Sequence, residues 1–308
     1  MNTLDALLGR VLIPFVTPFK ENGEIDHQTL GELAEMVIER GFCDSVIVGG
    51  TTGEFISMTY DERLSLFRTV KEAVNGRVPV VAGTGAAYTQ HAIMLTNEAE
   101  KLGFDVAMVV APYYLKPTQE GVYRHFKAVA ESTNLPILLY NIPLFTGTNI
   151  DPETLIALSQ IDNILGVKEE AGINPLQSSD YYLGTPDRFK VFSGDDMMVL
   201  QTLSQGGVGV VSGGSQVIGD RMKKMIDLFL KGDAIESTRI SLELYPFFKS
   251  LNQNGRVNPI PILRAAIGMT WREVGDPRLP LVPATDEERN HVRSVLEQMH
   301  VSLAETPV

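Results

Sequence analysis

Short runs of apolar residues recur along the first three quarters of the chain, and they are continuous rather than alternating. They are rich in Val and Ile, which is typical of parallel β-strands covered on both faces. Longer amphipathic stretches lie between them, so predicted strands alternate with predicted helices. The eight predicted strands are Val11–Val16, Ser45–Val48, Val78–Ala82, Val106–Ala111, Ile137–Tyr140, Ile164–Val167, Lys190–Phe192 and Val208–Val211.

The stretches between these runs have helical periodicity. In Thr29–Arg40 the apolar side chains fall on one stripe, and Gly41 follows as a stop signal. The strands begin roughly 20 to 35 residues apart, which is the length of one βα unit. The same pattern predicts further helices over Asp61–Val74, Gln90–Leu102, Gln119–Glu131, Pro152–Leu158 and Met197–Leu203.

Eight consecutive units of this kind predict an α/β fold, the (β/α)8 TIM barrel. An open doubly wound sheet is the alternative, and it normally carries a Gly-rich turn after its first strand. Here the first strand ends in Pro14–Phe19, which contains no glycine. Gly83 and Gly85 follow the third strand, but the third glycine of a dinucleotide-binding turn is missing. The pattern therefore favours the barrel.

Beyond about Gly232 the predicted strands cease and only helices follow. We predict a catalytic barrel over residues 1–232 and a C-terminal helical extension, packed on the barrel, over 233–308. The extension's predicted helices are Ala234–Asn252, Pro259–Met269 and Asp286–Met299.

Composition and charge narrow the class of ligand. Lys and Arg total 26 against 38 Asp and Glu, a formal net charge of −12, which repels nucleic acid and anionic membrane surfaces. Cys43 is the only cysteine, and the five histidines lack metal-ligand spacing, so we expect no metal site. The longest apolar runs fall short of the roughly 18 residues of a membrane span. The N-terminus lacks the basic residues of a secretory signal. We therefore expect a cytoplasmic protein with a small-molecule substrate.

Lys168 is the most informative residue at a strand end, where barrels of this class place their chemistry. It ends the run Ile164–Val167, so its amine should point into the barrel mouth among carbon atoms. A lysine attacks a carbonyl only as the free amine, and desolvation favours that neutral form. The alternative is a solvated salt bridge with Glu169 or Glu170. Alternation along the strand sends Glu169 to the opposite face, which weakens that alternative.

Tyr140 and two threonines end neighbouring strands. Tyr140 should lie level with Lys168, where a phenol can shuttle protons while a carbinolamine forms and loses water. A merely buried tyrosine is the alternative. Thr51 and Thr52, between glycines, offer hydroxyls and backbone N–H groups that suit a carboxylate, or else form an ordinary turn. Together these residues predict a nucleophile, an acid/base and an anion site at one barrel mouth.

These residues resemble the dihydrodipicolinate synthase/N-acetylneuraminate lyase family of Schiff-base aldolases. The resemblance extends from about Arg10 to Met269 and is specific for the family, not for one substrate. It rests on Thr17–Phe19, Gly50–Glu54, Pro112–Tyr114, Tyr140–Pro143, Gly147, Gly166–Lys168, Gly194–Asp196 and Asn258–Pro261.

The resemblance implies roles for these residues. Lys168 would form an imine with pyruvate or another 2-oxo acid, without any further cofactor, and Tyr140 would be the acid/base. Thr51 or Thr52 would hold the carboxylate and link Tyr140 to Tyr114, a catalytic relay residue from a neighbouring subunit. A homo-oligomer, a dimer of dimers, is therefore implied. We also expect six further strand-end and loop residues to bind substrate: Gly50, Phe145, Gly194, Asp196, Val211 and Ser212.

Two positions depart from the family's named enzymes. The synthases of the lysine pathway resemble Tyr-Asn-x-Pro-x-Arg-Thr-Gly, where the arginine receives the carboxylate of aspartate semialdehyde, but this chain has Phe145 there. Losing such a charged contact costs a few kcal/mol. The sialic acid lyases resemble Gly-x-Asp-Glu, and this chain has Met197 after Asp196. Asp196 can still bind sugar hydroxyls.

The sequence therefore favours an aldolase or dehydratase for a 2-oxo-3-deoxy sugar acid, or an aldolase for another uncharged aldehyde. The first alternative is the synthase that condenses pyruvate with aspartate semialdehyde. The second is a non-catalytic protein that binds 2-oxo acids. A further alternative places a phosphate site at Gly206–Gly214, as in many barrels.

Overall fold

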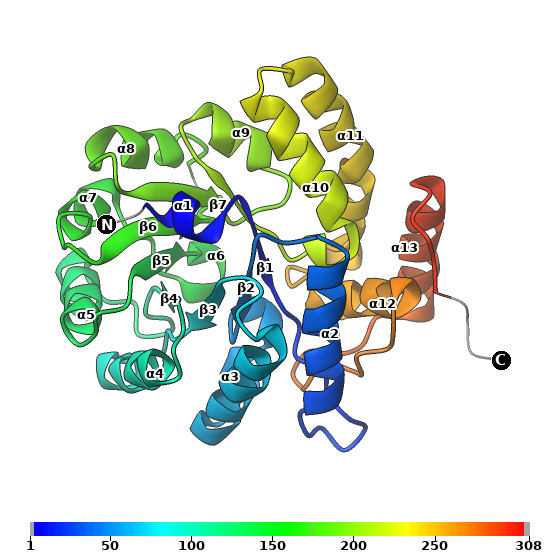
Figure 1. The fold of residues 1–308 in the computed structure, drawn as a ribbon, viewed down its shortest axis with the longest axis horizontal. Helices are drawn as coiled ribbons and strands as arrows, with labels where there is room; N and C mark the ends of the chain where they lie inside the picture. Colours follow the sequence, from blue (N-terminus) through cyan, green and yellow to red (C-terminus); the bar gives the residue numbers. More distant parts are fainter. Residues whose placement is uncertain (1–2, 173, 305–308) are drawn as a thin grey trace.

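Eight parallel strands close into a barrel in chain order, with β8 pairing to β1 (Figure 1). The computed structural model describes residues 3–172 and 174–304. The predicted (β/α)8 barrel is confirmed, and β6 extends past the predicted end to include Lys168 and Glu169. The strands are β1 (Val11–Pro14), β2 (Ser45–Val48), β3 (Val80–Gly83), β4 (Val106–Val110), β5 (Ile137–Asn141), β6 (Ile164–Glu169), β7 (Lys190–Ser193) and β8 (Gly209–Val211).

Helices surround the barrel and include all those predicted. Four helices were not predicted: α1 and α6 span about one turn, α8 begins with polar residues, and α10 has a kink at Ile218 that breaks its periodicity. The helices are α1 (Leu4–Leu8), α2 (His27–Glu39), α3 (Tyr60–Val74), α4 (Thr89–Lys101), α5 (Gln119–Glu131), α6 (Pro143–Thr146), α7 (Pro152–Leu158), α8 (Gln177–Gly184), α9 (Val199–Ser204), α10 (Ser215–Leu230), α11 (Ala234–Ser250), α12 (Ile260–Thr270) and α13 (Asp286–Gln298).

Alternation along the strands divides the apolar side chains into two cores. The outer core packs the strands against the helices, and the inner core fills the barrel. Leu4 and Leu8 of α1 belong to the inner core and are almost completely buried. A Cβ added at Gly166 of β6 would lie 2.9 Å from Leu4, so this strand has room for the α1 plug. Because α1 fills one end of the barrel, the opposite end, where the strands have their C-termini, is the place left for a functional site. None of the described helices is both long and apolar enough to cross a bilayer.

The C-terminal helices pack along one side of the barrel, on α10 and on one another (Figure 1). Arg264 of α12 reaches the barrel mouth, where its Nη1 donates to Glu54 Oε1 at 3.0 Å and to the Thr17 carbonyl at 2.8 Å. Both side chains of the ion pair are only 3% exposed. The extension is therefore joined to the loop that follows β2. Residues 1–2 and 305–308 lie outside the described residues, and a domain boundary at 232 stays a prediction.

We predict that Arg264→Met lowers the free energy of unfolding by about 3–5 kcal/mol, because it leaves the buried Glu54 carboxylate without its cation. Urea titration followed by circular dichroism measures the change. The control is Arg239→Met on α11, whose ion pairs with Glu236 and Glu243 are half exposed. That variant should lose far less stability than Arg264→Met, because solvent screens exposed ion pairs. Equal losses in both variants would contradict a structural role for the buried pair.

Candidate active site

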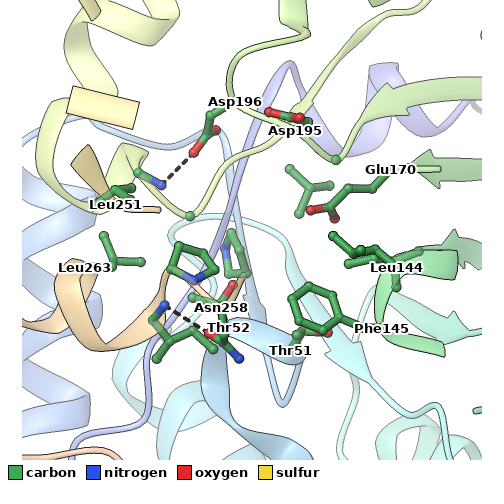
Figure 2. A pocket seen from close by; sticks show the side chains of 18 of the residues that line it. Thr51, Thr52, Leu144, Phe145, Glu170, Asp195, Asp196, Leu251, Asn258 and Leu263 are labelled. Carbon is green, nitrogen blue, oxygen red and sulfur yellow. Dashed lines mark hydrogen bonds between the residues drawn. The ribbon is translucent and has the colours of Figure 1, made fainter. Parts of the chain in front are cut away.

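A pocket of about 290 Å³ opens where the strands end. Figure 2 shows Thr51 and Thr52 on one side of it, Asp195 and Asp196 on the opposite side, and Glu170 between them at the edge. Most of the residues predicted from the sequence line this one pocket: Thr51, Thr52, Tyr140, Phe145, Lys168, Gly194, Asp196 and Val211.

Lys168 lies at the base of the pocket, 5% exposed, level with Tyr140 in the sheet register. Its Nζ is 3.1 Å from Glu170 Oε2 and 3.9 Å from the centroid of the Tyr140 ring. The amine therefore has a carboxylate as well as an aromatic ring beside it, and the expectation of an uncharged amine stays a prediction. The alternative of a salt bridge is confirmed for the pairing of Lys168 with Glu170. The salt bridge is not solvated as that alternative expected, because Lys168 is buried.

The strand geometry explains why Glu170 pairs with Lys168 and Glu169 does not. Glu169 points away from the pocket and accepts hydrogen bonds from Asn141 and the backbone N–H of Ala171. The backbone N–H of Glu170 donates to the Asn141 carbonyl at 2.9 Å, which continues the strand pairing by one residue. Residues two apart on a strand share a face. This periodicity was the signal in the sequence that identifies Glu170 as a pocket residue.

Tyr140 is 2% exposed, and its hydroxyl donates to Glu170 Oε2 at 2.9 Å. Burial raises the pKa of the Tyr140 phenol well above its ordinary value, and the Glu170 carboxylate adds to the rise. A contact with the Thr51 hydroxyl opposes it in part. Tyr140 is therefore a protonated phenol at neutral pH. It can donate its proton to an oxygen that develops negative charge.

Thr51 and Thr52 lie in a 3₁₀ turn, Thr51–Gly53, directly after β2. Thr17 Oγ1 donates to the Gly53 carbonyl at 2.7 Å, and the buried ion pair of Glu54 holds the end of the turn. Glu54 has a left-handed backbone, with φ at 58°. These contacts hold the two threonine hydroxyls at the pocket wall, where neutral donors can receive a carboxylate.

Gly194 lies at the end of β7, beside the lysine. A Cβ at this position would lie 2.6 Å from the Cβ of Glu170 and 2.9 Å from the Cε of Lys168. Real Cβ atoms do not approach other carbons so closely. Gly194 therefore makes room for the ion pair, which is a more specific role than the substrate contact predicted from the sequence.

Asp196 lines the side of the pocket opposite Thr51 and Thr52, and only one of its two carboxylate oxygens is hydrogen-bonded to the described residues. Its Oδ2 accepts the Gly214 backbone N–H at 2.9 Å, while its buried Oδ1 has no partner among the described residues. Burial raises the pKa of Asp196 to about 7. Val211 of β8 lines the pocket, but Ser212 does not. The Ser212 hydroxyl is fully buried and accepts from Ser215.

Two other predicted residues lie outside the main pocket. Tyr114 is 90% exposed in the single chain, with φ at 71°, and it does not line the site. Gly50 lines a small neighbouring cavity behind Thr51, with Tyr140 on its other side. The relay proposed for Tyr114 therefore depends on a second chain.

The glycine-rich stretch 206–214 is poorly suited to a phosphate. The backbone N–H groups of Gly206 and Gly207 donate to carbonyls of α9, and the Gly214 N–H donates to the Asp196 carboxylate. These three donors are thus occupied, and Asp196 adds negative charge. Among the described residues, no group of three or more His, Cys, Asp or Glu side chains is arranged to hold a metal ion.

Phe145 of α6 is 39% exposed and lines the pocket where the synthase pattern has arginine. Lys168 is the one cationic side chain in the described lining, against three carboxylates from Glu170, Asp195 and Asp196. Other lining residues not predicted from the sequence come mainly from α6, α11 and the loop before α12: Leu144, Phe248, Leu251, Asn252, Val257 and Asn258. The described lining therefore combines several apolar side chains with an excess of acidic ones.

The chain matches the model of the dihydrodipicolinate synthetase family over residues 7–299. It is 44% identical to a 4-hydroxy-tetrahydrodipicolinate synthase of Desulforudis audaxviator (strain MP104C), over 94% of this chain and 97% of the relative. Dihydrodipicolinate synthase of Cyanidioschyzon merolae with lysine bound has a TM-score of 0.92 and 40% identity, covering 96% and 99% of the two chains. The pyruvate complex of the Acinetobacter baumannii synthase has a TM-score of 0.87 and 30% identity, covering 96% and 100%.

We predict that Gly194→Ala slows pyruvate capture on Lys168 about 100-fold, because a displacement of about 1 Å at a reacting group has an effect of that order. Timed borohydride reduction and mass spectrometry measure the capture rate. The control is Gly31→Ala on α2, where the nearest neighbour of the new Cβ is 3.7 Å away. That variant should match the wild type. An unimpaired Gly194→Ala enzyme would refute the spatial role of this glycine.

Proposed function

This chain belongs to the dihydrodipicolinate synthetase family, and on that premise we propose that it condenses pyruvate with aspartate semialdehyde as a 4-hydroxy-tetrahydrodipicolinate synthase. As a member of this family the chain is a class I pyruvate lyase, an enzyme that uses a lysine Schiff base in place of an external cofactor. The non-catalytic alternative is not supported. The observation that carries the proposal is the buried Lys168 at the base of the pocket, beside Tyr140.

The relatives favour a different substrate from the one that the sequence favoured. The sugar acid aldolase rested on two departures, Phe145 and Met197, whereas relatives with the name 4-hydroxy-tetrahydrodipicolinate synthase match this chain over nearly its whole length. We therefore replace that prediction by its first alternative. Phe145 still affects the proposed reaction, because an apolar ring cannot bind the carboxylate of aspartate semialdehyde.

The pocket's residues fit the first half of the reaction. The Thr51 and Thr52 hydroxyls receive the pyruvate carboxylate, which places C2 of pyruvate near Lys168. The neutral amine attacks C2, and Tyr140 donates a proton to the oxygen that leaves as water. The resulting imine withdraws electrons from C3, so that loss of a C3 proton gives an enamine. The enamine carbon then attacks the aldehyde carbon of the second substrate.

The second substrate meets a pocket without the usual arginine. With Phe145 in place of the arginine, and with Glu170, Asp195 and Asp196 as the acidic groups of the lining, the semialdehyde carboxylate has only neutral partners. A hydrogen bond to a charged group contributes about 1.5–3 kcal/mol, more than one between neutral groups. We therefore expect weak binding of aspartate semialdehyde and ordinary binding of pyruvate.

We also propose that a second copy of the chain completes the site with Tyr114. The exposure of this tyrosine and its left-handed backbone fit a residue presented to a neighbouring chain. A Thr51 hydroxyl beside Tyr140 would link the two tyrosines. This arrangement accords with the dimer of dimers expected from the sequence.

We predict that incubation with pyruvate and borohydride adds one stable adduct, on Lys168 alone, and that aspartate semialdehyde is consumed when both substrates are present. Peptide mass spectrometry locates the adduct, and a coupled assay follows the condensation. The control Lys168→Ala should give neither. A different result would be an adduct on Lys168 and turnover of an uncharged aldehyde, with no turnover of aspartate semialdehyde. That result would refute the proposed synthase activity but would still support an imine on Lys168.

We predict that Phe145→Arg lowers KM for aspartate semialdehyde about 10- to 100-fold, because it restores a charged contact of about 1.5–3 kcal/mol. KM for pyruvate should change little. Steady-state kinetics at saturating pyruvate measure the effect. The matched control is Leu144→Arg, which adds the same charge at the neighbouring position of α6. Equal improvement in the two variants would show a general charge effect and count against a specific site at 145.

A further inference from the structure

One oxygen of Glu170 contacts both groups that carry out the chemistry. Glu170 Oε2 lies 3.1 Å from Lys168 Nζ and accepts the Tyr140 hydroxyl at 2.9 Å. The Glu170 backbone is held by its hydrogen bond to the Asn141 carbonyl, and Gly194 leaves the space that its side chain occupies. The carboxylate is therefore positioned by the fold. Its side chain is 27% exposed and lines the pocket.

We infer that Glu170 is a further catalytic residue, the carboxylate that accepts the proton of Lys168 before the lysine attacks a 2-oxo acid. It touches the reacting nitrogen directly. The relay tyrosine, Tyr114, lies outside the site of its own chain. Glu170 thus supplies within one subunit a proton acceptor next to both Lys168 and Tyr140. The inference rests on the proposed imine at Lys168 and does not depend on which aldehyde reacts next.

The proton transfers balance over the whole step. The Lys168 ammonium gives one proton to the Glu170 carboxylate, which leaves a neutral amine and a carboxylic acid. The amine's electron pair forms the N–C2 bond while the carbonyl π electrons move to oxygen. Glu170 and Tyr140 together supply protons as that oxygen becomes hydroxyl and leaves as water, and the nitrogen's proton returns to the tyrosine–carboxylate pair. The products are a protonated imine, one water and an ionised Glu170. The carboxylate then faces the iminium and stabilises its positive charge.

The other charged groups around Glu170 favour proton acceptance. Burial raises the pKa of Glu170, and the negative charge of Asp195 adds to the rise, while Lys168 and Tyr140 lower it. Asp196 lines the same pocket, and the negative charge of Glu170 in turn helps to raise the pKa of Asp196. As the pH falls through the raised pKa of Glu170, the carboxylate is protonated and loses its capacity to accept. Imine formation should therefore slow on the acid side, at a pH above the ordinary carboxyl range.

The test measures the rate of pyruvate capture at a series of pH values from 5 to 9, by timed borohydride reduction and mass spectrometry. In the wild type we expect a rise in rate as Glu170 ionises. Glu170→Gln keeps the shape of the side chain but cannot accept the proton. It should capture pyruvate at least about 100-fold more slowly at pH 8 and lack the acid-side rise. Glu170→Asp keeps the carboxylate, so it should retain the rise at a reduced rate.

Asp195→Asn and Asp196→Asn are the matched controls, since each removes one carboxylate from the same pocket without touching the ion pair. Both should keep the acid-side rise, with that of Asp195→Asn at slightly lower pH because a like charge has been removed. A Glu170→Gln enzyme that is slow but keeps the wild-type pH profile would reduce Glu170 to a structural role and overturn the inference. So would Glu170→Gln capture within about 3-fold of the wild type. A wild-type enzyme with no adduct on Lys168 would overturn the proposed function as well.

Discussion

The buried contact between Lys168 and Glu170 is the interaction on which the site depends. A lysine at the end of an apolar strand would lose its charge or turn to solvent if it had no partner. Here the carboxylate two residues further along the chain, directly after β6, holds the nitrogen at the base of the pocket. The pair exists because β6 continues through Glu169 and because Gly194, directly after β7, has no side chain. The barrel's register then places Tyr140 beside both groups.

The same pair sets the electrostatics of the pocket. Glu170, Asp195 and Asp196 all line the pocket, so the described lining has more negative than positive charge. In the proposed function a substrate carboxylate binds away from the two aspartates, at the neutral threonines on the opposite side. The Thr51–Gly53 turn is held there by Thr17 and by the buried ion pair between Glu54 and Arg264. The C-terminal helices thus support the site through Arg264, in addition to the residues by which they line the pocket.

The sequence predicted the features that repeat or lie at strand ends. Continuous Val/Ile runs predict parallel strands, and parallel strands place Tyr140 and Lys168 at one mouth. Glu170 could have been predicted in the same way, because residues two apart on a strand share a face. That prediction requires the knowledge that β6 continues past Lys168. The pairing of Glu54 with Arg264 links positions 210 residues apart, and no local pattern indicates it. The Ser212 hydroxyl contacts Ser215 and does not line the pocket. The sequence could not show this, because strand spacing does not identify side-chain partners within a loop. The relatives do not support the sugar acid substrate, because that prediction rested on two departures, Phe145 and Met197, and gave too little weight to the match over the whole chain.

In the proposed function, the carboxylate-paired Lys168 becomes the covalent site of a 2-oxo acid. A crystal of the protein soaked in pyruvate would reveal that bond. We expect continuous density from the Lys168 nitrogen to C2 of pyruvate, the pyruvate carboxylate at Thr51 and Thr52, and Glu170 facing the new C–N bond. Pyruvate bound without a covalent link, or Lys168 turned away from the pocket, would contradict it.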